Sequence, residues 1–581
     1  MATRSTGRRR PTSRRGGLLG SPKPARNGVD GRIRLLRFVF IVFLVLVGGK
    51  AVALASSSRH LTDLALAQQT RVIALPAHRG SILDRNGDEL AVGKPQQTVY
   101  ADPHLLKDPK AAADRLCDAL QINRRKARRA VEDALATAKA QKKWFAFVAR
   151  KVDPAYARRA VALGIPGVGS YEEEARTYPL KGTAAQVLGF DGMDNHGLSG
   201  IELLYDKDLA GKDGSETVVR DPAGNPLKTI SQQQPLAGQN VRLTLDSEIQ
   251  YFAEDVLKKT VRDTGGQSAV AVVMDPRTGE VLAMVNTVKG GFHGFGKDPT
   301  GEADKNRAVT DVYEPGSIFK LITISGALAD GTITPTEKFY LPPSIHVADR
   351  EINEAEPRGA VTWAAPQILE YSSNVGAVKI GERMGDAGMY KWVKAYGFGK
   401  LTGIQFPGES GGLVAPLDQW SGSSIGNIPM GQGVAVTAIQ MASAFSTVAD
   451  NGWQVKPRLV AQVGTKVYDT VDRHRVIPAK VAREVRQMLL LAVQDGTGQK
   501  AQIPGYDVAG KTGTAEIPLA DGSGYAKGIY TASFVGMVPA DHPRLVVLCA
   551  VKGTPEFGGD AAAPAVQQIM QFSLQHLEIA P

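Results

Sequence analysis

Three short motifs in the second half of the chain contain residues suited to nucleophilic catalysis. Ser317 is followed three residues later by Lys320, and this is the chain's only Ser-x-x-Lys. Downstream come Ser372-Ser373-Asn374 and Lys511-Thr512-Gly513-Thr514. A serine hydroxyl is a weak nucleophile until a base takes its proton, and a lysine can do so only when neutral. A single Ser-x-x-Lys is a weak signal, but three ordered motifs, each occurring once, indicate one active site.

The first motif must be positioned by a turn and a helix. Glu314-Pro315-Gly316 predicts a turn, and the apolar run 317–329, stopped by Asp330-Gly331, predicts a buried helix. Ser317 then opens the helix and Lys320 lies one turn on, on the same face. Backbone N–H groups at the start of the helix would supply half of an oxyanion hole.

Lys320 is expected to be neutral. Its neighbours in sequence are the apolar Ile318, Phe319 and Leu321. Burial among them, together with a second cation from Lys511, would lower the pKa of Lys320. The sequence therefore predicts a serine and a base that activates it.

The three motifs resemble those of the penicillin-binding protein and serine β-lactamase superfamily. The resemblance implies that Ser317 is the acylated nucleophile and Lys320 accepts its proton. Ser372 would relay a proton to the leaving amine, and Asn374 would hold the substrate's peptide amide.

The same resemblance assigns the Lys511-Thr512-Gly513-Thr514 motif to substrate binding. Lys511 would supply positive charge across the cleft, while Thr512 and Thr514, on either side of Gly513, would bind a terminal carboxylate. The N–H of Thr514 would complete the oxyanion hole. The chemistry needs no metal and no cofactor, and the sequence has no metal-binding or nucleotide-binding pattern.

The positive charge of the chain is concentrated at its start. The formal net charge is +11, but residues 1–37 hold eleven Lys or Arg and one Asp, so the remaining chain carries only +1. Nucleic acid is therefore not an expected partner. We expect a disordered basic tail over residues 1–33, on the cytoplasmic side.

An apolar segment follows the tail. Residues 34–55 are expected to form one transmembrane anchor in the cytoplasmic membrane, which sends the catalytic part to the outside. A cleaved signal peptide stays open as the alternative, because the apolar core is short and Ala53-Leu54-Ala55 resembles a cleavage site. Cys117 and Cys549, far apart in sequence, are expected to be small core residues.

Residues 56–240 are expected to form a separate, non-catalytic domain. Asn86-Gly87 predicts a hairpin turn, and residues 107–140 a small helical insert whose basic run 124–129 is a solvated face. Other motifs in this part are similar to those of the pedestal, or dimerisation, domain of class B penicillin-binding proteins. We hypothesise that its charged motif residues form partly buried ion pairs where strands of this domain meet. These residues are Arg79, Arg85, Arg176 and Glu202.

Residues 241–581 are expected to form an α+β transpeptidase domain. Strands near both ends of this part predict an antiparallel sheet covered by helices on both faces, with a helical subdomain inserted. Strand candidates lie at 269–274, 280–286, 508–517, 530–538 and 544–551. The strand that carries Lys511 is expected at the sheet edge, where a peptide substrate can pair with it.

The resemblance implies a D,D-transpeptidase that cross-links peptidoglycan stem peptides. Ser317 would attack the penultimate residue of a D-Ala-D-Ala donor, an amine acceptor would resolve the acyl-enzyme, and β-lactams would inhibit covalently. Ser-Ser-Asn-Val-Gly at 372–376 is closer to the cell-division (septal) type, whose partners would be a glycosyltransferase and other division proteins of the membrane. The alternatives are an elongation-type transpeptidase, a membrane-anchored β-lactamase and a catalytically silent division scaffold.

Overall fold

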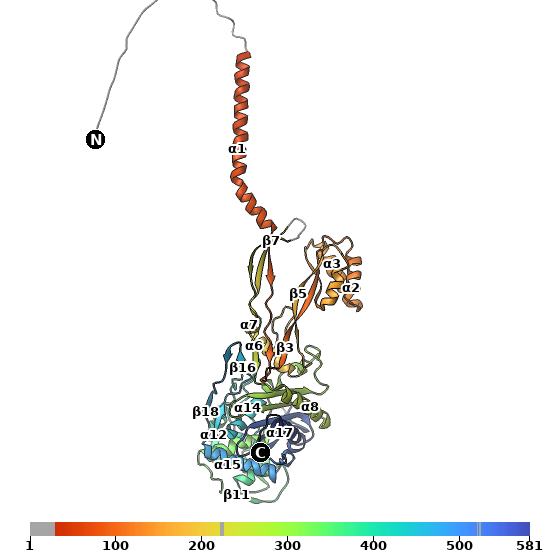
Figure 1. The fold of residues 1–581 in the computed structure, drawn as a ribbon. Helices are drawn as coiled ribbons and strands as arrows, with labels where there is room; N and C mark the ends of the chain where they lie inside the picture. The colour runs from red at the N-terminus through yellow and green to blue at the C-terminus, as the bar shows by residue number, and fades with distance from the viewer. Residues whose placement is uncertain (1–28, 221–225, 520, 522–523) are drawn as a thin grey trace, which may run out of the picture. The chain divides into compact units, whose positions relative to one another are not determined.

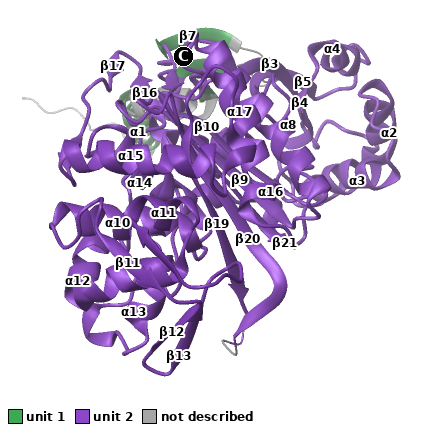
Figure 2. Ribbon diagram, turned by 90° about the horizontal axis from the view of Figure 1, so that it is seen from below, with its two compact units in different colours: residues 1–74, 215–233 green, residues 75–214, 234–581 purple. Residues whose placement is uncertain are grey.

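The computed structural model describes residues 29–220, 226–519, 521 and 524–581. The described residues form two compact units, which Figure 2 shows in green (within residues 1–74 and 215–233) and purple (within residues 75–214 and 234–581). The first unit, as far as it is described, contains helix α1 (Val29–Gln69) and a three-stranded sheet (Figure 1). The strand order is β1 (Thr70–Leu75), β6 (Gly214–Arg220) and β7 (Pro226–Gln233).

Helix α1 contains the predicted anchor. Its segment Gly31–Ser56 has 26 residues and contains an 18-residue stretch with a mean hydropathy of 2.6, so it is long and apolar enough to cross a membrane. Most of the predicted tail, residues 1–28, lies outside the described residues. For residues 29–33 the prediction of disorder was wrong, because Arg is a good helix former and Ile33 joins the apolar run of α1.

Residues 75–214 begin with the predicted hairpin. Strands β2 (Ile82–Leu83) and β3 (Glu89–Ala101) are antiparallel across the Asn86-Gly87 turn. Strands β4 (Ala146–Val152) and β5 (Val168–Thr177) pair with β3. Helices α2 (Pro109–Ala119) and α3 (Arg125–Ala140) form the predicted insert, and α4 (Pro154–Val161) joins their core. Cys117 is buried in that core, as predicted.

A five-stranded sheet forms the centre of the catalytic part, and each neighbouring pair of its strands is antiparallel. The order is β10 (Val281–Val288), β9 (Ser268–Met274), β21 (Leu545–Thr554), β20 (Tyr525–Val538) and β19 (Ala509–Pro518). Strand β19, which carries Lys511, is at the edge, so both the predicted sheet and the predicted edge are confirmed.

The residues of β9 alternate between two hydrophobic cores. Ala271 and Val273 pack in one core with α8 (Ser247–Asp263) and α17 (Ala563–His576). Val270 and Val272 belong to the other core, which contains α14 (Ala438–Ala449). Because successive side chains of a strand point to opposite faces, both faces of the sheet are covered, as predicted.

A helical subdomain is inserted between β10 and β19. Its main helices are α10 (Lys320–Ala329), α11 (Ala365–Glu370), α12 (Asn374–Ala395), α14 and α15 (Ala479–Gln494). Between α10 and α11 the chain forms two short antiparallel pairs of strands. β11 (Lys338–Leu341) pairs with β14 (Val361–Ala364), and β12 (Ser344–Val347) pairs with β13 (Arg350–Asn353).

The remaining elements are short. They are α5 (Ala185–Leu188), α6 (Gly200–Leu204), α7 (Asp206–Leu209), β8 (Val241–Leu243), η1 (Glu302–Asp304), α9 (Arg307–Thr310), η2 (Gly316–Phe319), η3 (Leu417–Gln419), α13 (Ser424–Asn427), η4 (Ile428–Met430), β15 (Trp453–Val455), β16 (Val460–Val463), β17 (Lys466–Val467), β18 (Arg473–Arg475), η5 (Gln499–Ala501) and α16 (Gly558–Ala561). Ile82, Leu90 and Ile201 share a core with the catalytic helices, so residues 75–214 and the catalytic part form one compact unit. The domain boundary at residues 240–241 stays a prediction.

Candidate active site

Ser317 lies in the 3-10 turn η2, and the α-helix α10 starts only at Lys320. The predicted α-helix from Ser317 was therefore wrong in its first turn. In a 3-10 turn, residues three apart are eclipsed, so the two side chains lie one above the other. The Nζ of Lys320 is 2.9 Å from the Oγ of Ser317.

Gly316 allows the turn to approach strand β19. Its φ is +57°, a left-handed conformation that favours glycine. A Cβ at this position would lie 2.8 Å from the carbonyl oxygen of Thr514. Its backbone N–H donates to the carbonyl oxygen of Gly431 at 3.0 Å. The nucleophile is therefore held between β19 and the loop at Gly431.

The amine of Lys320 also contacts the second motif. It lies 2.5 Å from the carbonyl oxygen of Ser372, 3.3 Å from the Oγ of Ser372 and 2.8 Å from the Oδ1 of Asn374. Ser372 has a φ of +58°, which is strained for a residue with a side chain. This backbone conformation brings both oxygens of Ser372 to the same amine.

The two lysines of the site, Lys320 and Lys511, are fully buried, with 0% of each residue exposed. Burial lowers the pKa of Lys320 to about 7, against a smaller opposite effect of the negative charge of Glu354. Burial also lowers the pKa of Lys511 well below its ordinary value, and the neighbouring Lys320 adds to this effect. The direction predicted for Lys320 is thus confirmed.

The third motif lies on β19. Lys511 Nζ donates to Thr512 at its carbonyl oxygen (3.2 Å) and at its Oγ1 (3.1 Å). The Oγ1 atoms of Thr512 and Thr497 are 2.7 Å apart, and Lys511 Nζ is 3.5 Å from Thr497 Oγ1. Thr497 is not among the site residues predicted from the sequence. The signal for it was the Asp-Gly-Thr-Gly turn that ends the preceding helix.

Gly513 and Thr514 bring β19 against the nucleophile. A Cβ at Gly513 would lie 2.8 Å from the carbonyl oxygen of Pro315 and 3.0 Å from a side-chain carbon of Ile318. The hydroxyl of Thr514 accepts a hydrogen bond from the N–H of Gly558 at 3.1 Å. Contacts therefore connect all three predicted motifs around one serine.

The charged residues predicted for the pedestal do not all lie together. Glu202 pairs with Arg79 at 2.8 Å and with Arg176 at 2.6 Å, and the exposed fractions of these three side chains are 0%, 2% and 1%. Arg85 is not part of this cluster, because it pairs instead with Glu280 at 3.7 Å and is partly exposed. The short β2 strand separates Arg85 in space from Arg79, which sequence motifs alone did not reveal.

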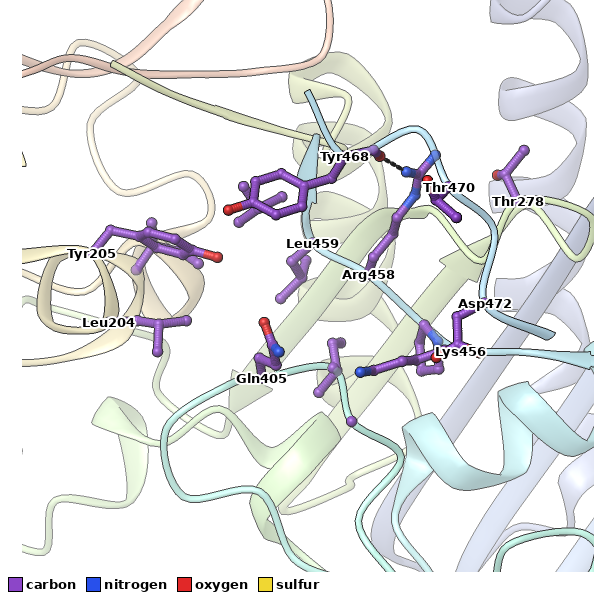
Figure 3. A pocket seen from close by; sticks show the side chains of 15 residues that line it. Leu204, Tyr205, Thr278, Gln405, Lys456, Arg458, Leu459, Tyr468, Thr470 and Asp472 are labelled. Atoms are coloured by element: carbon purple, nitrogen blue, oxygen red, sulfur yellow. Dashed lines mark hydrogen bonds between the residues drawn. The ribbon is translucent and has the colours of Figure 1, made fainter. Parts of the chain in front are cut away.

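A cavity of about 200 Å³ lies apart from these motifs. Figure 3 shows Tyr205 and Tyr468 on one side and Lys456 and Asp472 on another. None of its 15 lining residues belongs to the three motifs. The cavity therefore gives no support to a catalytic site at that place.

Comparison with known families assigns two domains to this chain. Residues 269–571 match the penicillin binding protein transpeptidase domain, and residues 74–243 match the penicillin-binding protein dimerisation domain. The chain belongs to the penicillin-binding proteins. A dimerisation domain followed by a transpeptidase domain is the arrangement of class B members, as the resemblance implied.

Curated relatives of this penicillin-binding protein cover most of its length. Penicillin-binding protein PbpB of Mycobacterium tuberculosis is 35% identical over 534 residues, which are 86% of this chain and 78% of the relative. Peptidoglycan D,D-transpeptidase FtsI of Escherichia coli is 32% identical over 521 residues, which are 88% and 86%. Among solved structures, penicillin binding protein 3 from Mycobacterium tuberculosis, complexed with aztreonam, has a TM-score of 0.69 and 29% identity, and the match covers 87% of this chain and 98% of that one.

Proposed function

We propose that this penicillin-binding protein is a serine-type peptidoglycan D,D-transpeptidase that cross-links stem peptides at the division septum and is acylated by β-lactams. One observation carries the proposal. The wholly buried amine of Lys320, with a pKa of about 7, lies 2.9 Å from the hydroxyl of Ser317. A neutral amine at that place is the base that a serine nucleophile requires.

The contacts of Lys320 direct its lone pair to Ser317. The carbonyl oxygen of Ser372 and the Oδ1 of Asn374 can only accept hydrogen bonds, at 2.5 and 2.8 Å. A neutral amine has two N–H groups, so these two acceptors occupy both. Its lone pair then remains for the proton of the Ser317 hydroxyl.

Acylation follows from this arrangement. The Oγ of Ser317 attacks the carbonyl carbon of the penultimate D-Ala, and its proton passes to Lys320. The backbone N–H groups of Ser317 and Thr514 stabilise the oxyanion. The C–N bond then breaks, and the D-Ala amine leaves with a proton relayed through the Ser372 hydroxyl, whose Oγ lies 3.3 Å from Lys320 Nζ.

Deacylation uses the same groups in reverse. The amine of a second stem peptide attacks the ester carbonyl, gives up a proton through Ser372 and Lys320, and releases Ser317 with its hydroxyl restored. Lys511, with the hydroxyls of Thr512 and Thr514, binds the terminal carboxylate of the donor, and Asn374 holds its peptide amide. Gly513 keeps β19 close to the nucleophile, where a Cβ would meet Pro315.

Membrane location completes the proposed role. Helix α1 anchors the chain with the N-terminus in the cytoplasm, and the catalytic part acts outside, where peptidoglycan is assembled. Its partners are a glycosyltransferase, which supplies the glycan strands, and other division proteins of the membrane. These assignments rest on the apolar segment and on division-type relatives such as FtsI.

The test uses the full chain in detergent or vesicles with a donor peptide that ends in D-Ala-D-Ala and an amine acceptor. We expect release of D-Ala and a new amide bond, both absent in Ser317→Ala. A labelled penicillin adduct should persist for many minutes. Rapid loss of the adduct would indicate a β-lactamase, and unchanged cell division with Ser317→Ala would indicate a scaffold. Localisation of a fluorescent fusion away from the septum would favour the elongation type.

A further inference from the structure

Glu354 is a buried carboxylate beside the active site that belongs to none of the three motifs. It lies in the loop between β13 and β14, and 5% of its side chain is exposed. Its Oε2 accepts a hydrogen bond from the backbone N–H of Asn374 at 2.7 Å. Its Oε1 accepts hydrogen bonds from the Oγ of Ser373 at 2.6 Å and from Arg358.

These contacts fix the start of helix α12. Ser373 caps this helix, since its Oγ accepts a hydrogen bond from the N–H of Gly376 at 2.9 Å. Glu354 therefore binds both the capping residue and the first residue of the helix, Asn374. Negative charge at a helix N-terminus is favourable, because the free N–H groups there carry partial positive charge.

The same loop orients the side chain of Asn374. Its Nδ2 donates to the carbonyl oxygen of Asn353 at 3.0 Å. Its Oδ1 then points the other way and accepts from Lys320 at 2.8 Å. Residues 353–354 thus determine which end of the Asn374 amide meets the catalytic lysine.

Glu354 is also the negative charge that acts on Lys320. Lys511 on β19 is the neighbouring positive charge, and Arg358 donates to Glu354 and lies over the ring of Trp363 at 4.5 Å. Several charged residues on the helices packed against α10 have partners other than Lys320. They include Glu370 of α11 with Tyr371; Lys379, Arg383 and Lys391 of α12 with Tyr340, Glu337 and Asp330; and Lys480 and Arg486 of α15 with Glu484 and Asn451.

We propose that Glu354 is a positioning residue for the reaction, which orients Asn374 toward Lys320 and places a negative charge near that lysine. This inference rests on the proposed role of Lys320 as base. A carboxylate stabilises the protonated form of a nearby lysine, so its removal makes Lys320 lose its proton at lower pH. A residue that only held the fold would not change that pH.

The experiment measures the rate of acylation by a fluorescent penicillin from pH 5 to 9 in the full chain. Glu354→Gln removes the charge but keeps the shape. We expect the midpoint of its profile to move about one pH unit lower and its plateau rate to fall about tenfold. Glu354→Asp keeps the charge, so its midpoint should stay in place while its plateau falls. Glu356→Gln, an exposed residue of the same loop, should match the wild type in both.

The outcomes separate this inference from the proposed function. If the pH profile of acylation has the same midpoint in Glu354→Gln as in the wild type, the proposed role of Glu354 is wrong. The proposed transpeptidase function would not be affected by that result. If Glu354→Gln does not fold, Glu354→Asp provides the test. An acylation rate at high pH equal to that of the wild type would then contradict the positioning role. Absence of acylation in the wild type would instead contradict the proposed function itself.

Discussion

The side-chain amine of Lys320 lies 2.9 Å from the hydroxyl of Ser317 although Lys320 is wholly buried. The 3-10 turn explains the contact, since it eclipses residues three apart. The environment explains the reactivity, since burial lowers the pKa of Lys320 to about 7. The same two residues therefore define both the geometry and the pH range of the reaction.

Acylation by a β-lactam should depend on pH through Lys320. The neutral amine is the active form, and protonation below its pKa removes it. The rate should therefore fall about tenfold for each pH unit below about 7 and reach a plateau above that pH. Because Lys511 interacts with Lys320, the measured value belongs to the pair. Stopped-flow acylation with a fluorescent penicillin gives the profile, and a rate independent of pH between 5 and 7 would contradict a neutral-lysine base.

Gly316→Ala should slow acylation about 100-fold. The added Cβ would lie 2.8 Å from the carbonyl oxygen of Thr514, so the turn must move away from β19 and take Ser317 with it. Gly331→Ala is the matched control, because Gly331 also has a positive φ, +68°, but has nothing within 4 Å of an added Cβ. Both variants carry backbone strain, so a similar loss of activity in both would show that the contact with Thr514 is unimportant.

Thr497→Val should slow acylation about fivefold at low β-lactam concentration, because the loss of a hydrogen bond between two neutral groups costs about 1 kcal/mol. Its hydroxyl is 2.7 Å from that of Thr512 and helps to fix the third motif. Thr497→Ser keeps the hydroxyl and should act like the wild type. The measurement is the second-order rate constant of acylation for the wild type, Thr497→Val and Thr497→Ser. Equal rate constants for the two variants would exclude a role for the Thr497 hydroxyl.

Glu202→Ala should destabilise the protein by about 3 kcal/mol, because it leaves the buried Arg176 without its carboxylate partner and leaves Arg79 with Asp206 alone. Arg85→Ala is the comparison, because its pair with Glu280 is longer and partly exposed and should contribute less than about 1 kcal/mol. Chemical denaturation, followed with circular dichroism, measures both variants. Equal midpoints for Glu202→Ala and the wild type would contradict the importance of this cluster.

Much of the catalytic part could be predicted from local patterns. The buried β-rich runs around Ala271 and Val547 and the helix that ends at Asp330 are all present. Apolar residues that recur at the spacing of a strand or of a helix indicate which face of the segment is buried. The type of these elements can therefore be predicted from the local sequence. The Asn86-Gly87 hairpin was predictable because its turn needs a positive φ at Gly87, +98°, a conformation that favours glycine.

What could not be predicted depends on contacts between distant segments. The fold brings three residues that are distant in sequence into contact with the motifs: Thr497, Glu354 and Gly558. No local sequence pattern indicates their partners. The 3-10 turn at Ser317 begins at Gly316, which contacts β19 and the Gly431 loop, and both of these lie far away in the sequence. Arg85 was misplaced for the same reason, since its partner Glu280 is almost two hundred residues away.

The most direct test of the central claim is the intact mass of the full-length protein after exposure to a β-lactam. We expect a single addition equal to the mass of the β-lactam, located at Ser317 by peptide mapping. Ser317→Ala should show no addition under the same conditions. An adduct that persists in Ser317→Ala, or no adduct in the wild type, would contradict the account.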